Sequence, residues 1–461
     1  MKNNLLFLVL FLFSTLCFSQ EKYKISYEKL KEYDGLYEYV NKGTIRMGAS
    51  PKDTLLFAII NESKYKLKAI GKDMFLNMSN EKVTFFRNQS KEIAGYITEK
   101  DSFKIKKKVS YSSSTWFPRL NKNIKVQAPI NLKDGLKAGK IEKSGLDLKL
   151  ISDMMAKIID GTYPNVHSVL IIKDDKLVLE EYFYEYNKDS LHELRSATKS
   201  FFSALTGIAI DKKIIKSTNE KVLSFFPEYN FENITELKKQ ITIENLLTNE
   251  SGLDCDASNP KTVGNETKMN NSDDWIKFTF DLPMLSIPGE NGMYCSGNPI
   301  TVGRIIEKES KTKLSDFAQK NLFEPLEIKK FKWNFKPDKS SVETFCQLYL
   351  RPRDMAKFGL LFLNNGKWNG KQIVSEEFVK QSLSKHSVIQ GVDYGYLWWI
   401  KYFDAAGTRY YGKGAQGNGG QRIYLFEEQN MVVVITAGNY NSQSSSDEII
   451  KKNILPVFNK K

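Results

Sequence analysis

The chain has 461 residues, of which 41% are hydrophobic and 12% aromatic, and its formal net charge is +14. This composition predicts a globular protein of two or three domains and excludes a fibrous one. The charge is carried mainly by lysine and is spread along the chain, without an Arg-rich block or a nucleic-acid-binding signature, so we expect no nucleic-acid partner. Weak association with anionic polymers of the cell envelope is compatible with this charge.

Residues 1–19 have the pattern of a secretory signal peptide. Lys2 supplies the positive charge, residues 5–16 form an apolar core, and small side chains follow where a signal peptidase cuts. We therefore expect an exported protein, periplasmic or secreted. The alternatives are a lipoprotein anchored through Cys17 and an uncleaved membrane anchor. Residues 14–16 lack the leucine and the small residue at the positions that a lipoprotein signal requires.

Residues 25–118 alternate apolar and polar side chains in short runs separated by turn residues, as in 54–60, 64–70 and 82–86. A period of two predicts strands, and helical periodicity is absent. The segment therefore predicts a small all-β domain, a sandwich or a barrel, whose role the sequence does not indicate. Residues 119–144 lack periodicity and contain several Lys, Asn and Gly residues, which is typical of a linker.

Residues 145–461 combine helices and strands. The strand pairs lie at both ends of this segment and the helices lie between them, which predicts an antiparallel sheet whose halves come from distant parts of the chain. The fold class is therefore α+β. Helices are expected at 146–159, from 196 onward and at 446–458, and hairpins at 168–184 and 421–436.

Ser196 and Lys199 form a Ser-x-x-Lys tetrapeptide at the start of a strongly apolar helix. Phe201, Leu205 and Ile208 recur behind them at helical spacing, so we expect this helix to be buried. Other copies of the tetrapeptide lack this context. They begin at Ser19, Ser26, Ser63, Ser79, Ser310 and Ser382.

A spacing of three residues places the side chains of Ser196 and Lys199 on one face of the helix. The N-terminus of a helix offers free N–H groups that can stabilise an oxyanion. Burial disfavours the charged form of a lysine, so such a lysine is suited to accept the serine proton. The alternative is that Ser196 only caps the helix and that Lys199 is a solvated residue of its first turn.

Further segments follow Ser196 in an order that a known family shares. They are Leu-Arg-Ser-Ala-Thr-Lys-Ser at 194–200, the stretch 241–253, Tyr-Cys-Ser at 294–296, and Arg-Pro-Arg-Asp at the start of 351–359. Together they resemble the beta-lactamase-related serine hydrolases, which include penicillin-binding proteins, class C beta-lactamases, esterases and 6-aminohexanoate-oligomer amidases. The resemblance covers about 145–461 and implies a beta-lactamase-like catalytic domain.

The resemblance also implies roles for single residues. Tyr294 would be the second proton-transfer residue, and Ser296 would hydrogen-bond the catalytic lysine or the substrate. Cys255 and Cys295 flank segments that would converge on the site, so they are the expected disulfide pair of an exported protein. Cys346 is left over.

The Lys-Thr-Gly motif of the best-known family members has no lysine in this chain. The corresponding stretch is Asn418-Gly419-Gly420, followed by Gln421. The glycines would let a substrate approach the strand, and the N–H of Gln421 would complete the oxyanion hole. Because the family's lysine helps to bind the carboxylate of penicillins and peptides, its loss favours a small ester or a short amide as the substrate. By the same resemblance, the Trp398–Trp399 pair would lie near the pocket.

Other chemistries lack their motifs. Gly-x-Gly-x-x-Gly at 412–417 runs into a strand and not into a helix, which argues against nucleotide binding. The cysteines have no CxxC spacing, and neither HExxH nor GxSxG occurs, so we expect no metal and no cofactor. His192, four residues before Ser196, is expected to lie outside the reacting shell.

The sequence therefore predicts an exported serine hydrolase that cleaves an amide or ester bond in a small-molecule or short-peptide acyl substrate. The reaction would pass through an acyl-enzyme on Ser196, with Lys199 and Tyr294 as acid and base. One alternative is a beta-lactamase or D-peptidase that acts on cell-wall-type substrates. Another is a catalytically silent ligand-binding protein of the cell envelope. The acyl donor and the oligomeric state do not follow from the sequence.

Overall fold

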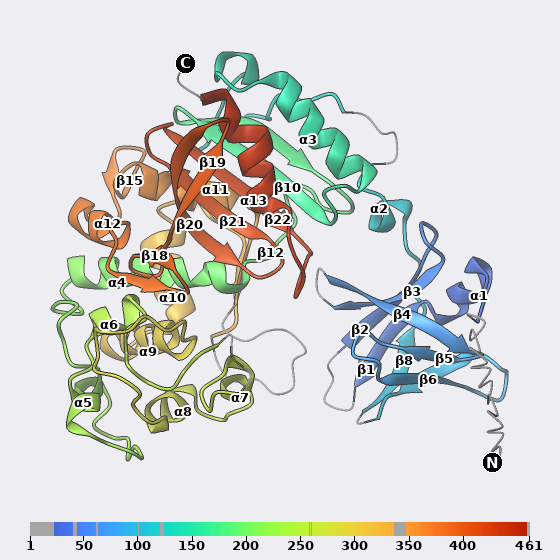
Figure 1. The fold of residues 1–461 in the computed structure, drawn as a ribbon, viewed down its shortest axis with the longest axis horizontal. Helices are drawn as coiled ribbons and strands as arrows, with labels where there is room; N and C mark the ends of the chain where they lie inside the picture. Colours follow the sequence, from blue (N-terminus) through green and yellow to red (C-terminus); the bar gives the residue numbers. More distant parts are fainter. Residues whose placement is uncertain are drawn as a thin grey trace, which may run out of the picture.

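The computed structural model describes residues 23–39, 44–60, 63–99, 101–119, 124–257, 259, 261–335 and 347–458. The predicted signal peptide and Cys346 lie outside these residues. The described chain forms two lobes, a smaller β-rich lobe from its first part and a larger lobe of helices and sheet (Figure 1). Among the described helices, none has the length and apolar character needed to cross a membrane.

The smaller lobe is a closed barrel in which strands β1 to β8 pair in chain order and β8 returns to β1. Along β4, Leu67 is buried while Lys66 and Lys68 on either side are exposed, so alternate residues enter the barrel. A barrel of this size can be filled by side chains, and Tyr37 and Phe75 are fully buried in it. The all-β domain predicted for 25–118 is thus a barrel. Its elements are α1 (Tyr27–Leu30), η1 (Lys31–Tyr33), β1 (Gly35–Tyr39), β2 (Thr44–Ser50), β3 (Leu55–Ile60), β4 (Ser63–Gly71), β5 (Met74–Leu76), β6 (Lys82–Arg87), β7 (Ile93–Ile97) and β8 (Ser102–Lys107), followed by α2 (Ser113–Trp116).

The larger lobe is built on a sheet in which, within the described residues, nine strands follow the order β17-β18-β19-β20-β21-β22-β10-β11-β9. Strands β10 and β22 pair antiparallel and join the two ends of the lobe's sequence, as predicted. The strands are β9 (Lys137–Ala138), β10 (Val166–Lys173), β11 (Lys176–Tyr182), β17 (Ser387–Ile389), β18 (Val392–Tyr394), β19 (Trp399–Ala405), β20 (Thr408–Gly417), β21 (Gln421–Phe426) and β22 (Met431–Ala437).

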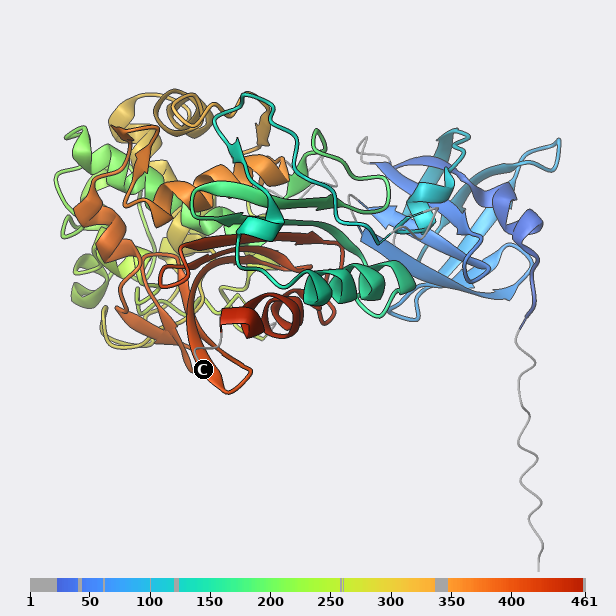
Figure 2. The same ribbon diagram turned by 90° about the horizontal axis from the view of Figure 1, so that it is seen from above.

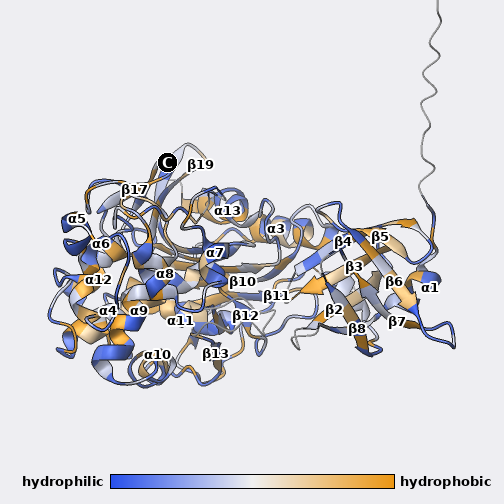
Figure 3. Ribbon diagram, turned by 90° about the horizontal axis from the view of Figure 1, so that it is seen from below, coloured by the Kyte–Doolittle hydropathy of each residue, from blue (hydrophilic) through white to orange (hydrophobic). Residues whose placement is uncertain are grey.

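Both faces of this sheet are covered. Along β22, Val432 and Val434 belong to one apolar cluster and Val433 and Ile435 to another. Figure 2 shows the sheet edge-on, with α3 and the C-terminal helices on one face and further helices on the other. In Figure 3 hydrophobic residues lie on the strands of both lobes and also on the helices of the larger lobe. The covering helices are α3 (Leu148–Asp160), α13 (Ser446–Ile449), the π-helical turn η6 (Ile450–Ile454) and η7 (Leu455–Phe458) on one face, and α4 (Lys199–Asp211) and α11 (Pro352–Leu363) on the other.

The remaining helices form a region beside the sheet, and the α+β class predicted from the sequence is confirmed. A small sheet of order β12-β14-β13 supports the start of α4. The elements of this region are β12 (His192–Glu193), η3 (Arg195–Thr198), η4 (Val222–Phe225), α5 (Glu236–Lys239), α6 (Ile243–Leu247), α7 (Glu266–Asn270), α8 (Trp275–Asp281), α9 (Gly297–Ser310), α10 (Leu314–Ala318), η5 (Gln319–Phe323), β13 (Phe331–Trp333), β14 (Leu348–Leu350), β15 (Lys367–Trp368), β16 (Lys371–Gln372) and α12 (Glu376–Ser382).

The segment between the lobes differs from the linker expected at 119–144. Strand β9 pairs with β11, η2 (Ile141–Lys143) follows it, and the carboxylate of Asp134 accepts a hydrogen bond from Arg353 Nε at 2.9 Å. Most of this stretch is therefore part of the larger lobe. Contacts between the lobes include the Lys64 ammonium, 5.1 Å from the ring centroid of Tyr184.

Candidate active site

The predicted nucleophile segment is the single turn η3, which runs directly into α4. All but the last two residues of α4 are buried. Phe201 stacks on Phe358 of α11 with ring centroids 3.7 Å apart. The buried helix expected from the apolar periodicity is confirmed, and its packing holds the start of the helix in the core.

Ser196 and Lys199 meet at the start of this helix. Lys199 Nζ lies 3.0 Å from Ser196 Oγ. The Lys199 side chain is almost buried, whereas Ser196 is half-exposed and can be reached from outside. Neither η3 nor α4, both described in full, begins with a side-chain capping hydrogen bond. The alternative of a simple cap beside a solvated lysine is therefore wrong.

Tyr294 lies on the other side of the lysine. Its ring centroid is 5.0 Å from Lys199 Nζ and 5.4 Å from the ring centroid of Trp399. Tyr294 and Trp399 are both half-buried, while Trp398 is completely buried in the core. Only the second tryptophan of the pair thus lies beside the predicted catalytic residues.

Asn249 fixes the backbone on both sides of Tyr294. Its carbonyl oxygen accepts from the Met293 N–H at 2.8 Å, and its Oδ1 accepts from the Cys295 N–H at 3.3 Å. Asn298 Nδ2 donates to the same Oδ1 at 3.0 Å. Asn249 is buried and adopts a φ of 58°, a left-handed conformation that asparagine tolerates better than most residues. The sequence pattern gave no sign of this role.

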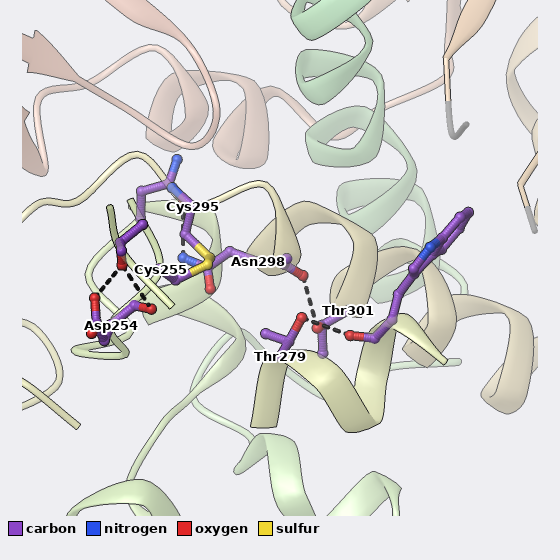
Figure 4. The surroundings of a disulfide bond; sticks show 10 residues. Asp254, Cys255, Thr279, Cys295, Asn298 and Thr301 are labelled. Carbon is purple, nitrogen blue, oxygen red and sulfur yellow. Dashed lines mark hydrogen bonds between the residues drawn. A yellow bond between two sulfur atoms is a disulfide. The ribbon is translucent and has the colours of Figure 1, made fainter. Parts of the chain in front are cut away.

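Cys255 and Cys295 form a disulfide with a Cα–Cα distance of 5.1 Å. This is the pair expected from the sequence. Figure 4 shows the bond beside the start of α9, with Asn298 next to it. Because Cys295 directly follows Tyr294, the disulfide ties the segment of the predicted acid–base residue to the segment that contains Asn249.

Ser296 is buried behind Lys199. Its Oγ has no hydrogen-bond partner among the residues that the structure describes, so the expected direct bond to Lys199 is not formed. Ser296 also precedes α9 without capping it through its side chain. Its hydroxyl lines a small cavity together with Lys199.

The stretch predicted to replace Lys-Thr-Gly forms the turn between β20 and β21. Gly419 and Gly420 have φ values of 88° and 101°, which require glycine in practice. The side chain of Asn418 donates to Asn441 Oδ1 at 2.8 Å. That of Gln421 donates to the Ala437 carbonyl at 2.6 Å and so joins β21 to β22. The hydrogen bonds of the Asn418 and Gln421 side chains therefore stabilise the turn and the strands next to it.

Gly417, the residue before this turn, packs against the nucleophile segment. A methyl group at position 417 would overlap the carbonyl oxygen of Leu194. Arg195, which follows Leu194, has a φ of 50°, a strained conformation for arginine. Its Nε lies 3.0 Å from the Glu193 carboxylate, and its guanidinium 4.6 Å from the ring centroid of Tyr440. Sequence analysis missed Gly417, although it is the last glycine of the rejected nucleotide-binding pattern.

Arg422 ties the end of β20 to the C-terminal helices. Its Nη1 donates to the carbonyl oxygens of Gly417 and Gln421 at 3.2 and 3.0 Å, and its Nε donates to Asp447 at 2.6 Å. Burial opposes the charge on Asp447, but the cations of Arg422 and Lys401 hold its pKa below the usual range. Asp447 therefore stays ionised to a lower pH than an ordinary aspartate.

His192 lies outside the group of predicted catalytic residues, as expected. Its Nε2 is 2.9 Å from Nδ1 of His167, and both side chains are buried. In the part of the chain that the structure describes, the His, Cys, Asp and Glu side chains form no cluster of three or more able to hold a metal ion.

A model of the Beta-lactamase family matches residues 150–452. The chain therefore belongs to the beta-lactamase family, whose members are generally serine hydrolases, and its larger lobe has the beta-lactamase-like fold predicted from the sequence. None of the curated proteins matches the chain.

Solved structures share this fold at low sequence identity. A candidate beta-lactamase from Bacteroides dorei is 18% identical with a TM-score of 0.53, and the match covers 67% of this chain and 99% of that one. A family VIII carboxylesterase is 13% identical with a TM-score of 0.55, covering 70% and 99%. An octameric penicillin-binding protein homologue from Pyrococcus abyssi is 19% identical with a TM-score of 0.51, covering 67% and 79%.

Proposed function

We propose that this chain hydrolyses a carboxylic ester or a short amide through an acyl-enzyme on Ser196. The observation that carries the proposal is the 3.0 Å distance between Ser196 Oγ and Lys199 Nζ at the start of a buried helix. A half-exposed serine beside an almost buried lysine is the arrangement of an activated nucleophile and its base.

In the first step, Lys199 in its neutral form takes the proton of the Ser196 hydroxyl as Oγ attacks the carbonyl carbon. The carbonyl oxygen becomes an oxyanion that the N–H of Ser196 stabilises, with a second N–H from the β20–β21 turn, Gln421 in our prediction. The leaving alcohol or amine departs with a proton from Tyr294 or from the Lys199 ammonium. Water then attacks the ester carbonyl on Ser196 while neutral Lys199 takes a proton from the water. The carboxylic acid leaves, and the proton returns from Lys199 to Ser196 Oγ.

The substrate class is inferred from the strand beside the nucleophile. Alternate residues of a strand share one face, so Ala415 lies on the same face of β20 as Gly417. These two residues next to the turn are small and uncharged, and Lys413 on the same face is paired with Glu427, which favours a substrate without a carboxylate at that end. A structural neighbour is described as a carboxylesterase and another as a candidate 6-aminohexanoate-dimer hydrolase, which supports ester and amide substrates.

The test is labelling with a fluorescent serine-reactive phosphonate. We expect the wild type and Ser79→Ala to be labelled, and Ser196→Ala to remain unlabelled. Ser79 is a matched control because it begins the same tetrapeptide in an exposed part of the barrel. An unlabelled wild type would favour a catalytically silent binding protein. Comparison of a p-nitrophenyl ester with nitrocefin would then rank esterase against beta-lactamase.

We also propose that the protein works outside the cytoplasm. The support is the predicted signal peptide together with a buried disulfide, because disulfides persist in oxidising compartments. Fractionation of the producing cell tests this. Recovery of the shortened chain from the periplasm or the medium is expected, whereas full-length chain confined to the cytoplasm would contradict the proposal.

A further inference from the structure

A small cavity of about 20 Å³ adjoins the nucleophile segment, where Arg195, Thr198 and Lys199 line it. Its polar lining includes the side chains of Lys199, Ser296 and Gln347, and apolar side chains complete much of the wall. Arg195 and Glu266 are the other charged residues that line it. A substrate group large enough to be recognised does not fit such a volume. A single water molecule does, because it needs about 10–15 Å³ of this kind of space.

The Ser296 hydroxyl is a buried polar group that needs a hydrogen-bond partner. The residue is 4% exposed, and its Oγ has no partner among the described residues. A buried hydroxyl that makes no hydrogen bond destabilises a protein by roughly as much as a core truncation of one methylene or more, so such groups are normally satisfied by ordered water.

We propose that an ordered water molecule occupies this cavity and bridges Ser296 Oγ and Lys199 Nζ. The inference rests on the proposed function of Ser196 and Lys199. A buried water needs two to four polar partners, and Lys199, Ser296 and Gln347, whose side chains end in an amine, a hydroxyl and an amide, all line the cavity. Gln347 is itself held near the nucleophile turn, since Thr198 Oγ1 donates to its Oε1 at 3.4 Å.

The water orients the base. A neutral lysine amine has two N–H bonds and one lone pair. When the water accepts one N–H and donates its own hydrogen to Ser296 Oγ, the lone pair of Nζ is left free to point at the Ser196 hydroxyl. No net proton transfer is required. Ser296 is therefore a positioning residue that acts on Lys199 through the water.

The kinetic test uses the acylation rate of Ser196 by the phosphonate, measured against pH. We expect Ser296→Ala to slow acylation about 10- to 100-fold, because a misplacement of about 1 Å in an active site can have an effect of that size. The acid limb of the profile should move to lower pH, because the ammonium form of Lys199 loses part of its solvation. We expect Ser296→Asn to retain at least half of the rate, since its amide oxygen can replace the water. Ser310→Ala, at the far end of α9, is the matched control.

A crystal structure of the wild type at a resolution that shows single waters gives an independent readout. Density for a water within hydrogen-bond distance of both Ser296 Oγ and Lys199 Nζ supports the inference. An empty cavity, or a Ser296→Ala variant with unchanged rate and pH profile, overturns it. Failure of the proposed function is distinguishable from this, because the wild type would then not be labelled at all.

Discussion

Gly417 at the end of β20 lies against the carbonyl oxygen of Leu194, two residues before Ser196, with no room for a Cβ between them. This contact brings the central sheet to the nucleophile turn. Arg422 holds the same Gly417 from its other side, through the carbonyl oxygen. The position of Ser196 relative to the sheet thus depends on one glycine and one partly buried cation.

Gly417→Ala is expected to reduce the acylation rate of Ser196 by about 100-fold, because a displacement of the order of 1 Å in an active site has that effect. The free energy of unfolding should fall by only about 1–3 kcal/mol, as for other overpacked sites. Phosphonate labelling and urea denaturation measure the two effects.

The control is Gly407→Asn, in the turn at the other end of β20. Gly407 has a φ of 79°, which asparagine tolerates, and a side chain there would meet no atom within 4 Å. If both variants lost labelling equally, the contact with Leu194 would not be the cause.

The Cys255–Cys295 disulfide closes a loop with a sequence separation of 40. Replacing both cysteines by serine is expected to lower the free energy of unfolding by about 2–4 kcal/mol, mainly because the unfolded chain gains freedom. Denaturation in urea without reductant measures this. Cys346→Ala is the control. It keeps the Cys255–Cys295 bond and should leave the free energy of unfolding unchanged. Equal stability of the double variant and the wild type would contradict a structural role for the bond.

The parts of the fold that sequence predicts well are those with local signals. The hairpins β10–β11 and β21–β22 lie close to their predicted positions because alternating apolar runs flank turn residues. Ser196 and Lys199 meet because they are three positions apart on a helix. These features depend on neighbours in the chain.

The features that sequence reasoning missed depend on contacts between distant segments. The sequence left both a sandwich and a barrel open, because the pairing of β8 with β1 that closes the barrel has no local pattern. The bond between Asn249 and the backbone around Tyr294 spans more than forty residues. Gly417 entered the sequence analysis only as the last glycine of a rejected nucleotide-binding pattern, and only the fold shows that Leu194 lies against it.

Asn249→Ala is expected to slow acylation at least about tenfold and to lower the free energy of unfolding by about 2–4 kcal/mol. It leaves the N–H of Cys295 and the amide of Asn298 without their acceptor, and alanine fits the left-handed conformation poorly. Stopped-flow labelling and urea denaturation measure these effects.

Tyr394→Phe is the matched control for Asn249. It removes only the long 3.4 Å hydrogen bond from Asn249 Nδ2 to the Tyr394 hydroxyl. We expect a loss of about 1 kcal/mol in stability and little change in rate. A larger kinetic effect from Tyr394→Phe than from Asn249→Ala would show that Asn249 does not position Tyr294.

His167 makes the stability of the protein sensitive to acid. Burial, together with the neighbouring His192 and Lys64, holds the pKa of His167 well below its usual 6.5. The unfolded chain therefore binds a proton near pH 6.5 that the folded chain does not bind until a lower pH. The part of the stability that depends on the neutral form of His167 is fully present above about pH 6.5. Below this pH the free energy of unfolding decreases, by at most about 1.4 kcal/mol per pH unit for one histidine.

Urea denaturation at pH 8, 7, 6 and 5 measures this slope. His167→Gln should be less stable than the wild type at pH 8, because it disturbs the 2.9 Å bond to His192, but it should lose less stability between pH 7 and 5. His386→Gln serves as the control, since His386 lies outside this pair and its Nε2 bonds to the Gln381 carbonyl. The same slope in His167→Gln as in the wild type would assign the acid sensitivity to other groups. A steeper acid loss in the wild type and in His386→Gln than in His167→Gln assigns it to the pair of His167 and His192, which lies at β12 just before the nucleophile turn.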